Sequence, residues 1–267
     1  MDQQSKVAVI GAGVMGEALI AALISSGVNP DLITISEKRE DRAQELISKY
    51  SIKAAVLNAN VSDADALLLV VKPQDMASVL EEIKGSINPK AVVITFAAGK
   101  TISFISNGLE TNNPVVRVMP NTPTLVGEGM AAASMGAGVT DAQREFVLGF
   151  LGATGKVIEV SEDLQDAVTA TSGSGPAYFF AFVEAMVAGA KELGLSEKDA
   201  TTLTVQTIVG AAKLLEESGK TATTLRENVT SPNGTTAAAL ASFGDDKLNS
   251  IVAKAMKAAR DRSQELA

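Results

Sequence analysis

Six residues near the amino terminus carry the clearest chemical signal. Positions 11–16 read Gly-Ala-Gly-Val-Met-Gly and come directly after the apolar run Val7–Ile10. In such a turn Gly11 allows a tight bend, Gly13 lets the backbone approach a pyrophosphate, and Gly16 lets the following helix pack closely on the strand. The start of that helix offers free N–H donors and the positive end of the helix dipole. With a strand before it and a helix after it, the motif predicts a dinucleotide-binding site.

The end of the next strand bears on the choice of coenzyme. Glu37 lies about 20 positions beyond the glycines, where an acidic residue commonly binds the ribose hydroxyls of NAD. Ser36, Lys38 and Arg39 could instead hold the additional phosphate of NADP. Because three potential phosphate partners face one carboxylate, the sequence favours NADPH, with NADH as the alternative. The charged residues that follow are interpreted as the solvated start of a helix: Glu40, Asp41 and Arg42.

Further strand ends should face the same site, since ligands of open α/β sheets bind beyond the carboxyl ends of the strands. Val70–Pro73 and Phe96–Gly99 close two buried runs, and their small residues would let a nicotinamide ring lie against backbone. Lys72 is also consistent with a surface cation, and Arg117 is as consistent with a structural ion pair as with a ligand contact. The residues expected to border the cofactor here are Val70, Val71, Lys72, Pro73, Phe96, Ala97 and Ala98.

The second half of the chain contains two polar insertions made of small residues. Thr171–Ala177 interrupts one helical run, and Ser231–Thr236 precedes another. Each is expected to end in a helix start whose unpaired N–H groups could bind a carboxylate. The alternative is simple capping by Ser and Thr. The second insertion is the stronger candidate, because it gathers several donors and no bulky side chain.

Short β-branched runs alternate with helix-like segments from Lys6 to about Val160, as in a parallel sheet with crossover helices. Several runs are apolar throughout, which indicates burial on both faces. The expected strands are Val7–Ile10, Leu32–Ser36, Lys53–Val56, Ala66–Val71, Ala91–Ala97, Val115–Met119, Met130–Met135 and Lys156–Val160. The clearest helices between them are Arg39–Tyr50, Gln74–Ile83 and Asp141–Gly152.

After about Asp163 the pattern is helical only. The expected helices are Ala177–Leu193, Ser196–Glu217, Thr221–Asn228, Thr235–Phe243 and Asp245–Leu266. They are rich in Ala and poor in large side chains, so a single copy would have a thin core, and we expect a second copy to complete it in a homodimer or a larger assembly of dimers. The predicted fold is α/β: a Rossmann-type doubly wound sheet domain over residues 1–162, then an all-α helical dimerisation domain over residues 163–267.

Composition narrows the chemistry further. None of the 267 residues is Cys or His, which excludes a Ser-His-Asp triad, a Cys nucleophile and a zinc site of the Cys/His kind, so no metal site is predicted. The 23 basic and 31 acidic residues give a net charge of −8, which disfavours binding to nucleic acid. Ala177–Ala190 is too short to span a bilayer, and Met1–Lys6 leaves no room for a signal peptide. We expect a cytoplasmic protein without a membrane partner.

The sequence resembles the pyrroline-5-carboxylate reductase family over almost its whole length. The most specific segments are those that end at Tyr178 and Thr236. One departure is Asn233, where the family usually has a second glycine. Because Asn tolerates positive φ, we expect the loop to keep its form. The segments that carry the resemblance are Gly11–Ala18, Val71–Gln74, Ala97–Gly99, Val116–Pro123, Asp166–Thr169, Ser172–Tyr178 and Asn228–Thr236.

The resemblance implies that NAD(P)H gives hydride to the C=N carbon of 1-pyrroline-5-carboxylate, yielding L-proline. It implies that Ser231, Gly234, Thr235 and Thr236 hold the substrate carboxylate and ring nitrogen, with Thr236 the candidate for a catalytic hydrogen bond. It places Glu162 and Asn228 at the junction of substrate and nicotinamide. Besides the strand ends above, it assigns the cofactor to Gly11, Ala12, Gly13, Val14, Met15, Gly16, Ser36, Glu37, Lys38, Arg39 and Asn228.

This chemistry suits a chain without histidine, because an imine can arrive protonated and accept hydride without a strong protein acid. One alternative is a related reductase of another imine or of a 3-hydroxy acid. The latter would require a catalytic lysine, for which Lys191 and Lys213 are the candidates. A second alternative, from another class, is a dinucleotide sensor without turnover.

Overall fold

The computed structural model of the chain describes residues 4–266. Two compact units form. The first takes in the chain up to Pro176 together with the segment from Ala259 onward, and the second runs Ala177–Ala258. The predicted boundary after residue 162 follows instead the change from strand pattern to helix pattern, and it stays a prediction.

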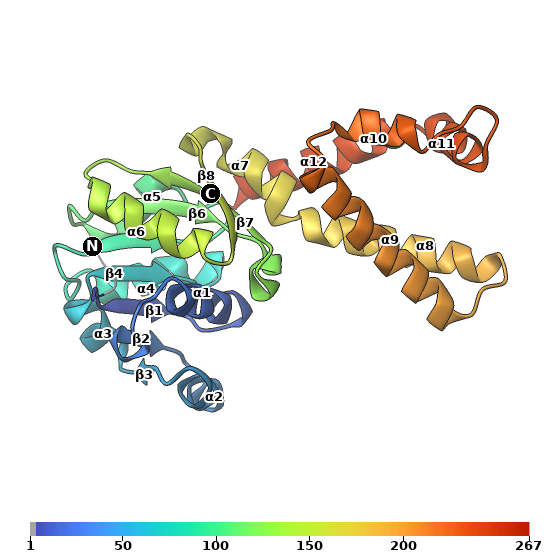
Figure 1. Cartoon of the computed structure of the whole chain (residues 1–267). Helices are drawn as coiled ribbons and strands as arrows, with labels where there is room; N and C mark the ends of the chain where they lie inside the picture. Colours follow the sequence, from blue (N-terminus) through green and yellow to red (C-terminus); the bar gives the residue numbers. More distant parts are fainter. Residues whose placement is uncertain (1–3, 267) are drawn as a thin grey trace. The chain divides into compact units, whose positions relative to one another are not determined.

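An eight-stranded sheet forms the centre of the first unit (Figure 1), with the strand order β3-β2-β1-β4-β5-β6-β7-β8. Every strand overlaps one of the eight predicted runs, which confirms the Rossmann-type α/β fold. The strands are β1 (Val7–Ile10), β2 (Ile33–Ser36), β3 (Lys53–Ala54), β4 (Ala66–Leu69), β5 (Val92–Thr95), β6 (Val115–Met119), β7 (Gly129–Met135) and β8 (Gly155–Glu159).

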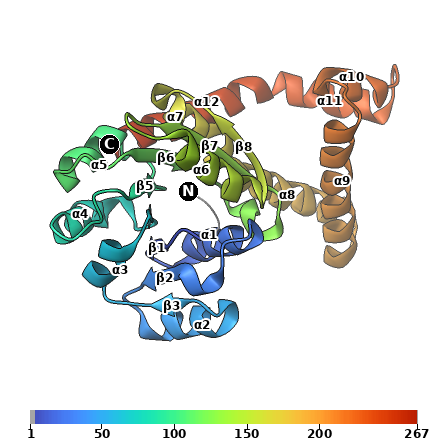
Figure 2. The same ribbon diagram turned by 60° about the vertical axis from the view of Figure 1, so that its left-hand side comes forward.

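Helices cover both faces of this sheet, as Figure 2 shows. On one face pack α1 (Val14–Ser25), α2 (Glu40–Tyr50) and α6 (Asp141–Gly152), and on the other α3 (Leu57–Asp63), α4 (Met76–Ile83) and α5 (Ile102–Leu109). Leu68 faces the first group and Leu67 the second, and both are fully buried. The uninterrupted apolar runs of the central strands follow from this burial on both faces. Four short 3₁₀ turns connect elements: Pro30–Leu32, Pro73–Asp75, Thr122–Val126 and Glu162–Leu164.

One pairing departs from the expected parallel sheet, because β7 runs antiparallel to β6, with Val118 opposite Ala133. The connection between these strands holds only the 3₁₀ turn Thr122–Val126. A parallel neighbour would require a crossover of about a dozen residues or more, usually a helix. The short connection therefore reverses the chain, and β8 then pairs parallel with β7.

The first polar insertion breaks the regular α-helical run, as predicted, but it does so with a π-helical turn and a bend at Ser174. Helix α7 (Gln165–Val168) continues through a π-helical turn over Thr169–Gly173 into α8 (Gly175–Glu192). The N–H of Ser174 donates to the carbonyl of Thr169 at 2.8 Å. Hydroxyl groups inside the turn donate to carbonyls four residues earlier, as from Thr171 to Ala167 at 2.8 Å. The N–H just before α8 is thus already bonded within the turn, unlike the free helix start expected there.

All five helices predicted for the second half are present. Besides α8 they are α9 (Glu197–Glu217), α10 (Ala222–Asn228), α11 (Thr235–Asp245) and α12 (Leu248–Glu265). Ser196 and Thr221 cap α9 and α10 through their hydroxyls. Within the second unit only Ala200 and Thr204 are buried, whereas Phe179 is 64% exposed and Ile251 57%. In one copy of the chain, this unit therefore has almost no core. Within residues 4–266, no helix has the length and apolar character to cross a membrane.

Candidate active site

A cleft of about 690 Å³ opens at the carboxyl ends of β1, β2 and β4. Strand β1 lies between β2 and β4, so the order of the chain along the sheet reverses here. In doubly wound sheets such a switch point is where ligands bind. The structure brings eight predicted cofactor residues together in the lining of this cleft: Gly11, Gly13, Ser36, Glu37, Lys38, Val70, Val71 and Lys72.

The three glycines of the turn have different surroundings. Gly11 has φ +88°, and a Cβ there would lie 2.9 Å from the carbonyl oxygen of Val70. A Cβ on Gly16 would collide with the carbonyl oxygen of Gly11. Gly13 has no atom within 4 Å of an added Cβ, and it caps α1 without a side-chain hydrogen bond. The turn is therefore closed against the sheet at Gly11 and Gly16 and open at Gly13, where a phosphate would meet unpaired N–H groups.

At the end of β2, most polar side chains already have partners. The Glu37 carboxylate accepts the N–H of Ala12 at 2.8 Å and that of Arg39 at 3.0 Å. The Ser36 hydroxyl donates to the carbonyl of Ala55 at 3.0 Å. The Arg39 guanidinium pairs with Asp41 at 2.7 Å. Lys38 also lines the cleft. Of the four residues 36–39, it is the one whose side chain has no hydrogen bond or ion pair to any residue in the described part of the chain.

Arg42 is not the solvated charge that the sequence suggested. Its side chain is 13% exposed, and its Nε donates to the carbonyl oxygen of Ala12 at 3.0 Å. Its other nitrogens pair with Glu17 and Glu45. Sequence reasoning missed this contact because the spacing of charges on α2 does not reveal which of them turns toward the glycine turn.

Glu17, on the first turn of α1, is the centre of this cluster. Lys49 donates to its carboxylate at 2.8 Å and the Tyr50 hydroxyl at 3.1 Å, and Arg42 pairs with it. The hydrogen bond from Lys49, with those from Arg42 and Tyr50, outweighs burial and lowers the pKa of Glu17 from 4.5 to about 2. The carboxylate is therefore ionised throughout the neutral range.

The remaining predicted cofactor residues of the first unit lie around the same sheet edge without lining the cleft. Ala12 and Gly16 are buried beneath the turn, and Val14 is 63% exposed. Phe96 and Ala97 are buried directly after β5. The full set comprises Ala12, Val14, Met15, Gly16, Arg39, Pro73, Phe96, Ala97 and Ala98.

Arg117 forms ion pairs inside the first unit. Only 5% of its side chain is exposed, and it lies 3.5 Å from Glu162 and 3.3 Å from Asp166. The Glu162 carboxylate also accepts the N–H of Ile102 at 2.6 Å. Both contacts use Oε1 of Glu162, and Oε2 has no partner within residues 4–266. Of the two roles weighed for Arg117, the structure shows the ion pair.

The second polar insertion lies in the second unit and has the expected helix start. Asn233 has φ +60°, as predicted for the residue in the glycine position. Gly234 caps α11 without a side-chain hydrogen bond, so the first N–H groups of that helix are free of side-chain partners. Ser231 and Thr235 are exposed, and Thr236 is half-buried. Asn228 is exposed at the end of α10.

Comparison with known proteins decides the family. A family model described as pyrroline-5-carboxylate reductase dimerisation matches residues 162–266, and one described as NADP oxidoreductase, coenzyme F420-dependent, matches residues 6–99. A pyrroline-5-carboxylate reductase of Corynebacterium melassecola is 41% identical over 97% of this chain and 98% of its own length. The chain belongs to the pyrroline-5-carboxylate reductase family.

Solved structures of the family agree with this assignment. A pyrroline-5-carboxylate reductase from Coxiella burnetii is 34% identical, covers 99% of both chains and has a TM-score of 0.90. The Plasmodium falciparum pyrroline carboxylate reductase with NADP bound is 27% identical over 100% of this chain and 99% of its own, with a TM-score of 0.89. This chain therefore shares its fold with these two solved structures over almost its full length.

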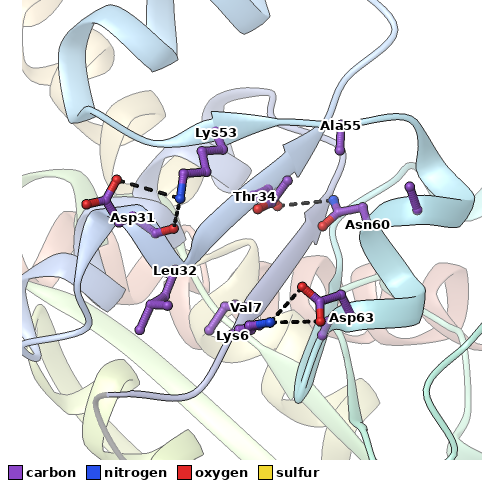
Figure 3. A pocket seen from close by; sticks show the side chains of 11 residues that line it. Lys6, Val7, Asp31, Leu32, Thr34, Lys53, Ala55, Asn60 and Asp63 are labelled. Atoms are coloured by element: carbon purple, nitrogen blue, oxygen red, sulfur yellow. Dashed lines mark hydrogen bonds and ion pairs between the residues drawn. The ribbon is translucent and has the colours of Figure 1, made fainter.

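A second pocket, of about 300 Å³, lies beside the amino ends of β1 and β2 (Figure 3). Its polar groups bond to one another. Lys6 pairs with Asp63 at 2.8 Å, Lys53 donates to the carbonyl of Asp31 at 2.7 Å, and the Asn60 amide donates to that of Thr34 at 3.1 Å. The cleft at the carboxyl ends keeps uncommitted donors, so it is the better ligand site.

Sequence reasoning did not anticipate several residues of the cleft. Asp75, Val79 and Glu82 contribute from the segment that leads into α4 and from that helix. Ala54–Leu57 runs from the end of β3 to the start of α3, and the prediction of a strand over 53–56 already placed its end at this edge of the sheet. The predicted end of this strand was therefore the sequence signal that could have found Ala54–Leu57. No comparable signal marked the α4 residues.

The lowered pKa of Glu17 makes a prediction about stability and pH. Its pKa is lower in the folded state, so its stabilisation is fully present above pH 4.5 and is lost as the pH falls toward 2. Glu17→Gln should lower the free energy of unfolding by about 1–3 kcal/mol at pH 7 and by progressively less below pH 4.5. Urea unfolding at a series of pH values measures this difference. Glu145→Gln, at an exposed position on α6, is the control. A difference for Glu17→Gln that did not vary with pH would contradict the assignment.

Proposed function

We propose that this chain reduces 1-pyrroline-5-carboxylate to L-proline with NAD(P)H, the last step of proline biosynthesis. The observation that carries the proposal is the open glycine turn at the switch point, in a chain whose full-length relatives are named for this reaction. No observation favours a 3-hydroxy-acid dehydrogenase. Of its candidate lysines, Lys191 pairs with Glu197 at 3.0 Å.

The residues of the cleft fit a dinucleotide. The space beside Gly13 admits a phosphate, and the first N–H groups of α1 would bind it. The volume of about 690 Å³ lies within the range of cofactor sites. Val70–Lys72 and Phe96–Ala98 would border the nicotinamide half. When bound, the reduced nicotinamide supplies the hydride.

NADPH is the proposed preferred coenzyme. Lys38 lines the cleft with an uncommitted ammonium group, which can pair with a ribose phosphate. Both oxygens of Glu37 already accept backbone N–H groups, from Ala12 and Arg39. That carboxylate is therefore less available to ribose hydroxyls. The Plasmodium falciparum relative has NADP bound, which supports the same coenzyme class.

The loop before α11 is the proposed substrate site. The N–H groups at the start of this helix and the Ser231 hydroxyl would hold the substrate carboxylate. The hydroxyls of Thr235 and Thr236 would bind near the ring nitrogen, Thr236 providing the catalytic hydrogen bond. A protonated imine needs no protein acid to accept hydride, and the chain has no histidine to provide one. Asn228 and the free oxygen of Glu162 are proposed for the junction of substrate and nicotinamide.

The second unit is proposed to form a homodimer, which can be the building block of a larger assembly. Large apolar side chains are exposed on its helices, among them Phe179 and Phe180 on α8 and Leu203 on α9, while almost nothing is buried inside it. A second copy would cover these surfaces. We expect light scattering at micromolar concentration to give at least twice the chain mass of 27.5 kDa. A monomer would contradict the dimer.

Cytoplasmic location and the absence of nucleic-acid and membrane partners remain part of the proposal. The net charge of −8 supports the absence of a nucleic-acid partner, because an acidic surface repels phosphate backbones.

The activity is tested by mixing the purified protein with 1-pyrroline-5-carboxylate and following the absorbance of NADPH or NADH. We expect oxidation of the coenzyme and formation of proline, with a higher kcat/KM for NADPH. A lack of turnover with both coenzymes would refute the function. Turnover with a preference for NADH would refute only the coenzyme assignment.

The role of Thr236 has its own test. Thr236→Ala should lower kcat at least several-fold, because it removes the hydroxyl that would bond the reacting imine, together with one methyl group. Thr236→Ser keeps a hydroxyl and should stay close to the unchanged protein. Steady-state rates with matched circular dichroism spectra measure the effect. Equal rates for the Ala and Ser variants would move the catalytic hydrogen bond to another residue.

A further inference from the structure

Both backbone polar groups of Ala12, in the middle of the glycine turn, are held by side chains from outside the turn. Its N–H donates to the Glu37 carboxylate at 2.8 Å. Its carbonyl oxygen accepts from Nε of Arg42 at 3.0 Å. Ala12 itself is fully buried. The peptide planes before and after this residue are therefore both anchored.

The anchoring of the second plane bears on the ligand. In a planar trans peptide, the carbonyl of one residue and the N–H of the next point in opposite directions. By holding the carbonyl of Ala12, Arg42 fixes the direction of the N–H of Gly13. Gly13 lines the cleft and has open space beside it, whereas Arg42 is not part of the lining. Arg42 thus acts on the turn without touching the ligand.

The guanidinium of Arg42 is itself held in place. One nitrogen pairs with Glu17 on α1 and another with Glu45 on α2 at 2.8 Å. Lys49 and Tyr50 in turn bind Glu17. A guanidinium can make three directed contacts in one plane, and the ammonium of a lysine cannot reproduce this fork. The geometry selects arginine over a general positive charge.

We propose that Arg42, oriented by Glu17, is a positioning residue for the pyrophosphate turn, and that it sets the affinity for NADPH and NADH equally by orienting the N–H of Gly13. The inference rests on the proposed function, since it assumes that the cleft binds a dinucleotide. It adds a residue that contacts neither the coenzyme nor the substrate. Both coenzymes share the pyrophosphate, so the effect is independent of the ribose phosphate.

Arg42→Lys tests this directly. We expect the KM and the dissociation constant to rise about five- to tenfold for both coenzymes, because a misdirected N–H of Gly13 weakens one hydrogen bond to the pyrophosphate. The ratio between NADPH and NADH, the kcat and the KM for 1-pyrroline-5-carboxylate should change less than twofold. A residue that only braces α1 against α2 would lower the melting temperature without this pattern.

Two control variants separate the turn contact from general effects. Glu45→Gln removes the charge of the exposed partner of Arg42, whose pair is screened by solvent, and it leaves the buried Glu17 and the contact with Ala12 in place, so coenzyme affinity should change less than twofold. Arg144→Lys alters an arginine that pairs with Glu159 on another part of the sheet, and it should leave all constants unchanged. Unchanged affinity in Arg42→Lys, or weakening for NADPH alone, would overturn the proposal. If Arg42→Lys does not fold, Glu17→Gln decides, because it should weaken both coenzymes about two- to threefold, and unchanged affinity would overturn the proposal.

Fluorescence titration with NADPH distinguishes the failure of this inference from that of the proposed function. If the unchanged protein binds NADPH but does not turn over 1-pyrroline-5-carboxylate, the reaction is refuted and the role of Arg42 is still measured by the dissociation constants. If the unchanged protein binds neither coenzyme, both proposals fall.

Discussion

The close approach of the glycine turn to the end of β4 is the constraint on which the first unit depends. A Cβ at Gly11 would lie 2.9 Å from the carbonyl oxygen of Val70, so only glycine allows these two strand ends to lie side by side. This contact occurs where the order of the chain along the sheet reverses. The sharp turn of the backbone at Gly11 therefore positions the cleft, the open space at Gly13 and the start of α1.

The two units differ in how their apolar side chains are buried. The sheet unit has two apolar layers, one on each face, and its central strands have no exposed side. The helical unit has small residues along its helices and exposed large ones, so its apolar surface requires a further partner. The family models divide the chain in a similar way, because an NADP oxidoreductase model matches residues 6–99 and a dimerisation model matches residues 162–266.

Charge near the glycine turn is arranged so that anions can approach it. Glu17 would place a negative charge close to the start of α1, but Arg42 and Lys49 pair with it. Glu37 is likewise bonded to backbone N–H groups. The free cation of the group is Lys38, within the described chain. Acidic residues thus orient the turn, while an uncommitted basic one faces the cleft.

Local sequence determined most of the architecture, because strand and helix periodicity, capping residues such as Ser196, and glycine positions act over a few residues. It also determined the edge of the sheet at which the site lies. Only the tertiary structure decided the antiparallel direction of β7, the π-helical turn at Thr169–Gly173 and the contact of Arg42 with Ala12. These depend on how residues far apart in the chain meet, and no local pattern encodes that geometry.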